Sequence, residues 1–240
     1  MSAHAPALGT MPTREAVMDQ AREENFPVAL WLLGPRVRRH LKAIYGFARL
    51  VDDIGDEAAG DRLALLDQVE RELDAPDHPV MCALTETVRE CALPREPLLR
   101  LIEANRRDQV VTRYDSFQEL LDYCRLSAAP VGELVLHVFG TATPDRIALS
   151  DRLCAGLQVI EHLQDVDEDR ARGRVYIGPF DGAAHARALL EEGAPLVRLL
   201  RGRARLAVAG FLAGGRTALE TIEGRGTRFP VAYAKAVAGR

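Results

Sequence analysis

The spacing of the apolar residues restricts how this chain can fold more than any other feature. From Thr13 onward apolar residues recur every three or four positions through most of the 240 residues, and no long stretch alternates apolar with polar residues. A period near 3.6 predicts helices, whereas a period of two would predict strands. We therefore expect an all-α protein whose Ala, Leu and Val side chains fill the contacts between helices.

Proline and glycine residues mark where the predicted helices end. Pro130 and Gly132 lie inside an otherwise helical pattern, so that helix is expected to kink or unwind there. No internal repeat or long linker is visible, and the economical interpretation is a disordered N-terminus over 1–12 and a single helical domain over 13–240. We expect helices at 13–24, 34–58, 61–75, 79–92, 95–110, 116–140, 144–173, 182–191, 195–223 and 228–238.

The composition excludes several classes of protein. A net charge of −4 provides no basic field for nucleic acid. The four cysteines (Cys82, Cys91, Cys124 and Cys154) show no C-x-x-C spacing and lie in apolar helical patterns, so we expect buried, reduced thiols. The N-terminus carries no signal segment and no apolar run approaches the length of a membrane span. We expect a cytoplasmic protein, with peripheral contact at the inner face of the membrane left open.

A first group of acidic side chains lies near the end of the predicted helix 34–58. Tyr45, Arg49, Asp52, Asp53 and Asp56 fall on one face at about 100° per residue. Carboxylates near a helix C-terminus oppose the helix dipole, so the group does not serve to stabilise the helix. The plain alternative is a solvated acidic helix end.

A second group lies on the predicted helix 144–173, where Gln158, Glu161, Asp165 and Asp169 share one face. Two such helices can face each other across the cavity of a bundle, where the carboxylates would repel one another and their pKa values would rise. Divalent cations with a preference for oxygen ligands remove that penalty, and Mg²⁺ keeps coordination places for substrate phosphates. The pair of groups therefore predicts a Mg²⁺-diphosphate site. The alternative is a coincidental pair of acidic surfaces.

Several arginines lie close to the two acidic groups in the sequence. Arginines beside bound Mg²⁺ can hydrogen-bond a departing diphosphate and stabilise its charge. Each one taken singly is more often a partner in a surface ion pair. The candidates are Arg49, Arg106, Arg107, Arg113, Arg172 and Arg174.

The ordered motifs of the chain resemble those of the squalene/phytoene synthases, the head-to-head branch of the trans-isoprenyl diphosphate synthases. The resemblance covers residues 15–177 and 195–222, and the segments 24–28, 45–49 and 124–127 look most like the bacterial hopanoid-pathway branch, the hydroxysqualene synthases. The matching motifs are Tyr45-x-x-x-Arg49-x-x-Asp52-Asp53-x-x-Asp56, Asp108 to Tyr114, Tyr123-Cys124, Val131-Gly132 and Asp165-x-x-x-Asp169-x-x-x-Gly173-Arg174-Val-Tyr176.

The resemblance implies an isoprenoid-synthase-type helical bundle around a central cavity, a prenyl diphosphate substrate and Mg²⁺ as the cofactor. The aromatic rings near the cavity are expected to stabilise cationic carbons through their faces, although core packing is the better interpretation of Phe139. The implied metal ligands are Asp52, Asp53, Asp56, Glu161, Asp165 and Asp169; the implied catalytic residues are Tyr45, Arg49, Tyr123 and Arg174; and the implied substrate contacts are Phe26, Arg113, Tyr114, Gln158 and Gln164.

In the branch that the motifs resemble, presqualene diphosphate is ionised and water captures the cation to give hydroxysqualene. We expect that reaction here, and no nucleotide-binding motif supports reduction by NADPH. Three alternatives stay open. They are the condensation of two farnesyl diphosphates, the transfer of a short prenyl group to an aromatic acceptor, and an inactive assembly factor of the same fold. The sequence predicts no oligomeric state.

The chain departs from the family pattern in three places. Many relatives have Asn in place of Glu161 and Arg in place of Gln164, and both changes look compatible with the hydroxysqualene branch. Between Tyr176 and Pro195 about one helix is missing. We expect the cavity to be more open near 177–195, with apolar residues such as Leu189 and Leu190 lining the opening, and an alcohol as the main product.

Overall fold

The computed structural model describes residues 9–23, 33–225 and 229–238. Within these ranges the regular structure is helical, and the only pairing of β type is an isolated bridge between Arg113 and Val175. The expected all-α fold class is confirmed. The chain divides into two compact units, residues 1–110 and 111–240. The single domain over 13–240 stays a prediction.

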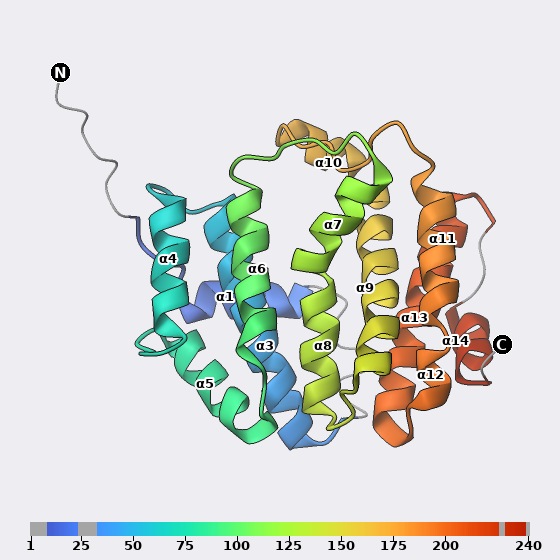
Figure 1. Cartoon of the computed structure of the whole chain (residues 1–240), viewed down its shortest axis with the longest axis horizontal. Helices are drawn as coiled ribbons and strands as arrows, with labels where there is room; N and C mark the ends of the chain where they lie inside the picture. The colour runs from blue at the N-terminus through green and yellow to red at the C-terminus, as the bar shows by residue number, and fades with distance from the viewer. Residues whose placement is uncertain (1–8, 24–32, 226–228, 239–240) are drawn as a thin grey trace. The chain divides into compact units, whose positions relative to one another are not determined.

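In the first unit, α3 is the helix against which the others pack. It contacts α1, α4, α5 and α6 and buries an apolar face that includes Phe47, Leu50, Val51 and Ile54. Burying these side chains fixes the rotation of α3 and so decides which of its residues point away from the core. The helices of this unit are α1 (Arg14–Glu23), α3 (Pro35–Asp56), α4 (Arg62–Glu72), α5 (Pro79–Cys91) and α6 (Arg95–Arg107) (Figure 1).

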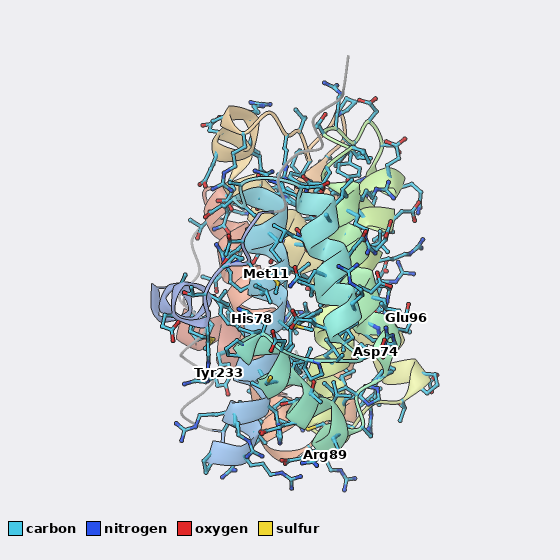
Figure 2. The ribbon with its side chains drawn as sticks, turned by 90° about the vertical axis from the view of Figure 1, so that its left-hand side faces the viewer. Met11, Asp74, His78, Arg89, Glu96 and Tyr233 are labelled. Carbon is cyan, nitrogen blue, oxygen red and sulfur yellow. The ribbon has the colours of Figure 1, made fainter. Side chains whose placement is uncertain are left out.

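Local sequence signals explain where these helices begin. Proline occupies the first turn of both α3 and α5, where the missing backbone N–H costs nothing. His78 caps α5 because its Nδ1 accepts a hydrogen bond from the backbone N–H of Val80 at 3.3 Å (Figure 2). Its Nε2 lies 3.0 Å from the carbonyl oxygen of Pro12. This contact ties the segment before α1 to the unit.

In the second unit, α9 is the central helix. It contacts α7, α8, α11, α12 and α13, and Figure 1 shows it between α8 and α11. Thr143 caps its N-terminus, and a capping box of Ser116 and Glu119 begins α7. The helices are α7 (Phe117–Ser127), α8 (Ala129–Val138), α9 (Pro144–Gln164), α10 (Val166–Ala171), α11 (Gly182–Gly193), α12 (Leu196–Leu199), α13 (Gly202–Ile222) and α14 (Phe229–Ala238).

Three predicted helices are interrupted. The break between α7 and α8 falls at Ala128, just before Pro130, as the proline predicts. The break before α13 falls at Leu200 and Arg201, whose backbone is extended, and α13 begins at Gly202, whose left-handed φ of 54° suits glycine. The third break is at Asp165, and here the expectation of one continuous helix over 144–173 is wrong. The six residues of α10 bury no side chain, so no packing holds them in line with α9.

The structure also bears on the expected burial of the cysteines and on the expected lack of a membrane span. Cys124 is buried and its pKa is raised to about 12 by burial, but Cys82 is exposed, so the expectation of four buried thiols is wrong for that residue. Cys82 lies on the outer face of α5, where a helical position near apolar residues does not guarantee burial. In the described part of the chain, no helix is long and apolar enough to cross a membrane. Residues 1–8 lie outside the described residues.

Candidate functional site

The first acidic group lies at the C-terminal end of α3, on the face that the core leaves open. Asp52 is exposed, Asp56 is partly exposed and Asp53 is buried, with 6% of its surface accessible. Arg49 and Tyr45 lie about one and two turns earlier, respectively, and are partly exposed. The predicted face is therefore present, and it carries Asp52 and Asp56 toward solvent at an i, i+4 spacing.

Asp52 is held in place by a residue that the sequence motifs did not indicate. The buried Asn105 of α6 donates a hydrogen bond from Nδ2 to Asp52 Oδ1 at 2.9 Å. This approach needs glycine at position 55, because a Cβ there would lie 2.1 Å from Asn105 Oδ1. Gln109 Nε2 donates to the Gly55 carbonyl oxygen at 3.0 Å, which adds a second hydrogen bond to this part of α3. A neutral amide thus orients a carboxylate without neutralising it.

The second carboxylate, Asp53, is paired inside the unit. Arg49 Nε lies 2.7 Å from Asp53 Oδ1, one turn away on α3. Burial raises the pKa of Asp53, and the positive charge of Arg49 opposes that rise. Because Asp53 already has a cationic partner, it is a weaker candidate for a metal ligand than Asp52 or Asp56.

Asp52 differs from an ordinary surface carboxyl group. Loss of hydration is the largest cause that raises its pKa, to about 7, and the nearby charge of Asp56 adds to the rise. The hydrogen bond from Asn105 opposes it. Asp52 nevertheless keeps an exposed surface, where water screens charge. A raised pKa marks a carboxylate whose charged form a bound cation would stabilise.

The second acidic group is divided between two helical segments. Gln158 and Glu161 lie on α9, Asp165 is the residue between α9 and α10, and Asp169 lies on α10. The expectation that these four residues share one face of a single helix is corrected in this respect. Glu161, Gln164 and Asp165 are exposed, and Asp169 is partly buried.

A pair of backbone hydrogen bonds brings the aromatic residues of the second unit together. The N–H of Tyr114 donates to the Val175 carbonyl at 3.1 Å, and the N–H of Val175 donates to the Thr112 carbonyl at 2.8 Å. As a result the ring centroids of Tyr114, Tyr123 and Tyr176 lie 5.4 to 5.7 Å apart. Tyr114 and Tyr123 were predicted from the sequence. Tyr176 was quoted only as part of a motif, and its ring belongs to the same buried cluster.

His162 is a second residue of this site that the sequence analysis missed. Its ring stacks on Tyr176 with centroids 3.8 Å apart and planes 11° apart. Its Nδ1 lies 3.4 Å from Asp169 Oδ2, and its Nε2 lies 3.3 Å from the side-chain nitrogen of Gln158. Gln158 Oε1 in turn accepts a hydrogen bond from Ser127 at 3.2 Å. A histidine in the middle of an acidic helix face was the signal that could have indicated it.

The predicted arginines have different environments. Arg174 is partly buried, and its backbone N–H donates to the Asp169 carbonyl oxygen at 2.8 Å while its guanidinium donates to the Tyr176 hydroxyl at 3.4 Å. The side chain of Arg113 is 59% exposed and pairs with Asp115 at 2.5 Å. Arg106 pairs with α4 carboxylates and Arg172 with Glu168, as expected for surface ion pairs. Phe26 lies outside the described residues, and Phe139 is partly buried.

The donor atoms present at both acidic groups suit Mg²⁺. Asp52, Asp56 and Asp165 offer carboxylate oxygens with access to solvent, and the pKa of Asp52 is raised mainly by loss of hydration, with a smaller contribution from the charge of Asp56. Among the described residues, no three His, Cys, Asp or Glu side chains lie close enough together to form a complete metal site. Mg²⁺ as the cofactor stays a prediction.

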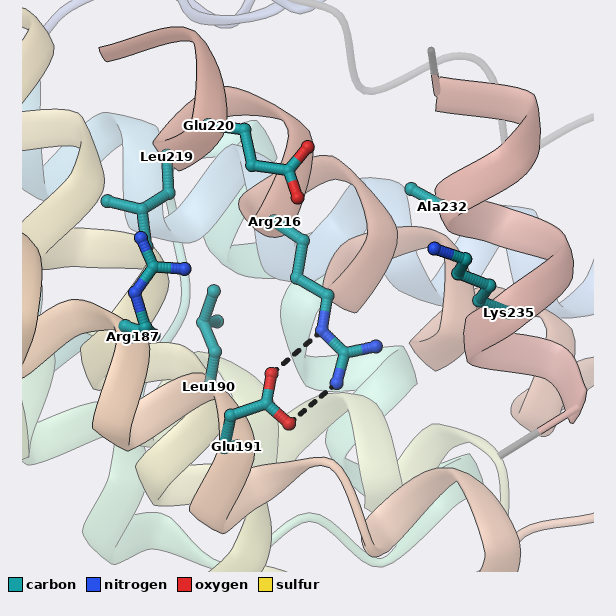
Figure 3. Close-up of a pocket in the computed structure, with 8 residues that line it drawn as sticks. All are labelled: Arg187, Leu190, Glu191, Arg216, Leu219, Glu220, Ala232 and Lys235. Carbon is teal, nitrogen blue, oxygen red and sulfur yellow. Dashed lines mark hydrogen bonds and ion pairs between the residues drawn. The ribbon is translucent and has the colours of Figure 1, made fainter. Parts of the chain in front are cut away.

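The segment after Tyr176 leads to a small pocket within the second unit (Figure 3). It has a volume of about 240 Å³ between α11, α13 and α14. Leu190 and Leu219 line it together with charged side chains, including Glu191 and Arg216, which form a paired contact at 2.8 Å. Leu189 and Leu190 themselves are buried. Leu190 lines this pocket as expected, and the wider opening expected near 177–195 stays a prediction.

Comparison with known proteins gives consistent matches. The family model for squalene/phytoene synthase matches residues 20–179. The hydroxysqualene synthase of Sinorhizobium fredii is 41% identical over 177 residues, covering 71% of this chain and 60% of the relative. The enzyme of the same name from Rhodopseudomonas palustris is 40% identical over 207 residues, covering 81% and 70%. The chain thus spans about 60 to 70% of the length of these relatives.

A solved structure extends the match to the fold. The crystal structure of squalene synthase HpnC from Alicyclobacillus acidocaldarius superimposes with a TM-score of 0.80 at 38% identity. The superposition covers 88% of this chain and 93% of that chain. The shared fold therefore includes the C-terminal helices beyond the region that the family model matches.

Proposed function

The chain belongs to the squalene/phytoene synthase family, and from that membership we propose that it ionises presqualene diphosphate and yields hydroxysqualene after water captures the cation. Two hydroxysqualene synthases at 40 and 41% identity support this choice among the reactions of the family. The resemblance of the sequence motifs to the hydroxysqualene synthase branch predicts the same reaction.

The observation that carries the proposal is how the two acidic groups are held. Asp52 is oriented by the neutral amide of Asn105, and Asp169 lies against the imidazole ring of His162. In each unit, therefore, an amide or imidazole side chain orients a carboxylate through a polar contact. Side chains fixed in this way favour the binding of a cation over a role in stabilising the fold.

Mg²⁺ is the cofactor that we propose for these carboxylates. The candidate ligands are Asp52 and Asp56 in the first unit, with Asp53 nearby, and Asp165 and Asp169 in the second unit, with Glu161 nearby. When bound, Mg²⁺ would neutralise diphosphate oxygens and make the diphosphate a better leaving group. The protein itself contributes the fixed carboxylates and the guanidinium group of Arg174, which can hydrogen-bond a diphosphate oxygen.

The proposed reaction begins with ionisation of the substrate. The C–O bond to the diphosphate breaks, and its electron pair leaves with the diphosphate. The resulting cyclopropylcarbinyl cation opens to an allylic cation, a water oxygen forms a new C–O bond, and the extra proton passes to solvent. The rings of Tyr114 and Tyr123 would stabilise the cation through their negative quadrupole. Together with Tyr176, one face of which is covered by His162, they would limit the access of bulk water to the wrong carbons. No reductant is needed.

One observation favours a second candidate. The solved structure with a TM-score of 0.80 is named a squalene synthase, and formation of squalene would require a hydride donor in place of water. The condensation of two farnesyl diphosphates, short prenyl transfer and an inactive assembly factor remain outcomes of the same test.

We include peripheral contact with a membrane in the proposal, because both the substrate and the product are lipids. The start of α3 supports it. Arg36, Arg38 and Arg39 are exposed there, and Glu90 pairs with Arg36 and Arg39, which leaves a net positive charge. Exposed basic residues attract anionic headgroups.

The test is incubation of the purified protein with Mg²⁺ and presqualene diphosphate in ¹⁸O-labelled water, with and without NADPH, followed by mass spectrometry of the organic extract. We expect hydroxysqualene that carries one ¹⁸O atom and does not depend on NADPH. The Asp56→Ala variant is the negative control.

The other outcomes identify the alternatives. Squalene that appears only with NADPH would establish the reductive reaction. Turnover of farnesyl diphosphate but not of presqualene diphosphate would establish the condensation. A labelled aromatic product formed from a short prenyl diphosphate would establish prenyl transfer, and no turnover of any diphosphate would favour the assembly factor.

A further inference from the structure

We infer that His162 is a positioning residue that joins the second acidic group to the aromatic cluster and so fixes the Asp169 carboxylate and the Tyr176 ring relative to each other. This inference rests on the proposed function, because Asp169 and Tyr176 act on a substrate only if that function holds. Neither the family motifs nor the residues expected from the sequence include His162.

The position of His162 in the chain makes it suited to this role. It lies in the last turn of α9, is 9% exposed and is the buried side chain nearest to the break at Asp165. Beyond the break, α10 buries no residue of its own. Packing therefore gives α10 little support, and its placement depends on individual contacts. The Asp169 side chain reaches back across the break to His162 at 3.4 Å.

The polar contacts around His162 are compatible with one assignment of donors and acceptors. With the Gln158 amide placed as the structure has it, Oε1 accepts from the Ser127 hydroxyl and the side-chain N–H faces His162 Nε2. Nε2 then acts as the acceptor, which leaves the proton of the neutral imidazole on Nδ1. Nδ1–H can donate to the Asp169 carboxylate. One tautomer thus satisfies the whole chain from Ser127 to Asp169.

The two polar distances, 3.3 and 3.4 Å, are longer than the usual range for strong hydrogen bonds. Stacking therefore supplies the other part of the constraint. The His162 ring lies nearly parallel to the Tyr176 ring with centroids 3.8 Å apart. Tyr176 is itself held by the neighbouring backbone bridge at Val175 and by the contact of its hydroxyl with Arg174. His162 thereby transmits the position of a fixed ring to a carboxylate on a weakly packed helix.

Two substitutions separate the hydrogen bond from the stacking. His162→Phe keeps an aromatic ring against Tyr176 and removes the donor to Asp169. His162→Asn places an amide N–H near the position of Nδ1 and removes the ring. A matched control exists in the same unit, because His185 stacks on Phe117 with centroids 3.7 Å apart and planes 4° apart and lies on α11, outside both acidic groups. His185→Phe therefore changes the same side chain in a similar stack.

The first measurement uses no substrate. Hydrogen–deuterium exchange of residues 166–171 reports how firmly α10 is held, and we expect exchange at least about tenfold faster in His162→Phe than in the wild type or in His185→Phe. The asparagine variant should exchange at a rate between the two. Exchange of α10 that is unchanged in His162→Phe would overturn the inference. If the phenylalanine variant does not fold, Asp169→Asn removes the charge from the other side of the contact and must also accelerate exchange in α10.

The second measurement is calorimetric titration with Mg²⁺ and inorganic pyrophosphate as the probe. Loss of a group that orients a metal ligand typically weakens binding about 10- to 100-fold, and we expect the lower end of that range for His162→Phe. The asparagine variant should stay within about threefold of the wild type because it restores the donor. Equal binding by the wild type and by His162→Phe would contradict a positioning role.

The two measurements distinguish the possible failures. If the wild type binds no Mg²⁺-pyrophosphate while exchange in α10 still depends on His162, the proposed function fails and the structural link stands. If binding is normal and neither readout responds to His162, the inference fails and the proposed function stands.

Discussion

The two acidic groups differ in how the fold holds them. The first lies on α3, a helix of 22 residues that continues without interruption through Asp56 and packs against four other helices. The second lies across a break, with Asp165 between α9 and α10 and Asp169 on a helix of six residues that buries nothing. The first group is fixed by core packing, whereas the second depends on side-chain and backbone contacts at Asp169.

This difference predicts that the two acidic groups contribute differently to stability and to ligand binding. A carboxylate on a well-packed helix keeps its position whether or not ligand is present, while one on a weakly packed segment can adjust when a ligand arrives. Substitutions that disturb the first group should therefore reduce stability, and substitutions around the second should reduce ligand binding at little cost in stability. Each of the following predictions tests one side of this comparison.

The largest effect is expected when either group loses a proposed ligand. Asp56→Ala or Asp165→Ala should lower kcat by about a thousandfold or more, because stabilisation of the leaving diphosphate is lost. The helical circular-dichroism spectrum should be preserved, since both side chains have access to solvent. Steady-state turnover of presqualene diphosphate measures the effect, and Asp122→Ala on the exposed face of α7 is the control. Parallel loss of helicity and activity would mark these carboxylates as structural.

The next effect concerns the packing around the first group alone. Gly55→Ala places a Cβ 2.1 Å from Asn105 Oδ1, so Asn105 must move away from Asp52. We expect the free energy of unfolding to fall by about 1–3 kcal/mol, as for other overpacked sites. Chemical denaturation measures it.

A matched control for this substitution lies in the second unit. A Cβ at Gly214 of α13 would meet no atom within 4 Å, so Gly214→Ala should leave stability unchanged or raise it by up to about 1 kcal/mol. Equal changes at the two glycines would contradict the tight packing of Asn105 against α3.

A smaller effect is expected in the pH dependence of stability. Desolvation raises the pKa of Asp52 from its ordinary 3.8 to about 7. Between these values the folded state binds more protons than the unfolded state, so this group makes the metal-free protein less stable as pH rises through that window. If Mg²⁺ is the cofactor as proposed, it would bind the charged form of Asp52 and oppose the loss. The increase in Tm on addition of Mg²⁺ and pyrophosphate should therefore grow by about 2–4 °C from about pH 5 to about pH 8.

Asp52→Asn is the appropriate comparison for the pH experiment. This variant keeps the size of the side chain and removes its titration, so its Tm increase should vary less with pH than that of the wild type. An increase in Tm that is independent of pH in the wild type would show that Asp52 is charged throughout the range.

The comparison also explains which parts of the site could be predicted. The period of apolar residues and the prolines gave the helices, because both act through neighbours in the sequence. The acidic faces followed from the same periodicity. Asn105 and Asp52 are 53 positions apart, and their contact depends on how α6 packs against α3. The break at Asp165 depends on the absence of packing around α10, which no local residue signals. For these reasons Asn105, His162 and Tyr176 were found only in the structure.

The arginines of the second unit show the same limit of sequence reasoning. Arg113 and Arg174 both match family motifs, but their environments differ. Arg174 is partly buried and adjoins Asp169 and Tyr176, so its guanidinium group is constrained near the proposed site of the leaving group. Arg174→Ala should lower kcat by about one to two orders of magnitude, in the range for the loss of one charge-stabilising donor. A lower kcat together with near-normal affinity for Mg²⁺ in the absence of diphosphate would identify a contact between Arg174 and the diphosphate.

Arg113 is expected to show the smallest effect of the set. Its side chain is mostly exposed and is paired with Asp115, so its charge is already compensated and screened by water. Exposed pairs of this kind contribute about 0.2–1 kcal/mol, which corresponds to a change in KM of up to about fivefold. We expect Arg113→Ala to raise KM within that limit and to leave kcat unchanged, because a contact equally strong in the ground and transition states affects only binding. A fall in kcat as large as that for Arg174→Ala would mean that Arg113 leaves Asp115 and contacts the diphosphate during the reaction. In that case the second unit would rearrange around its substrate more than the weak packing of α10 alone implies.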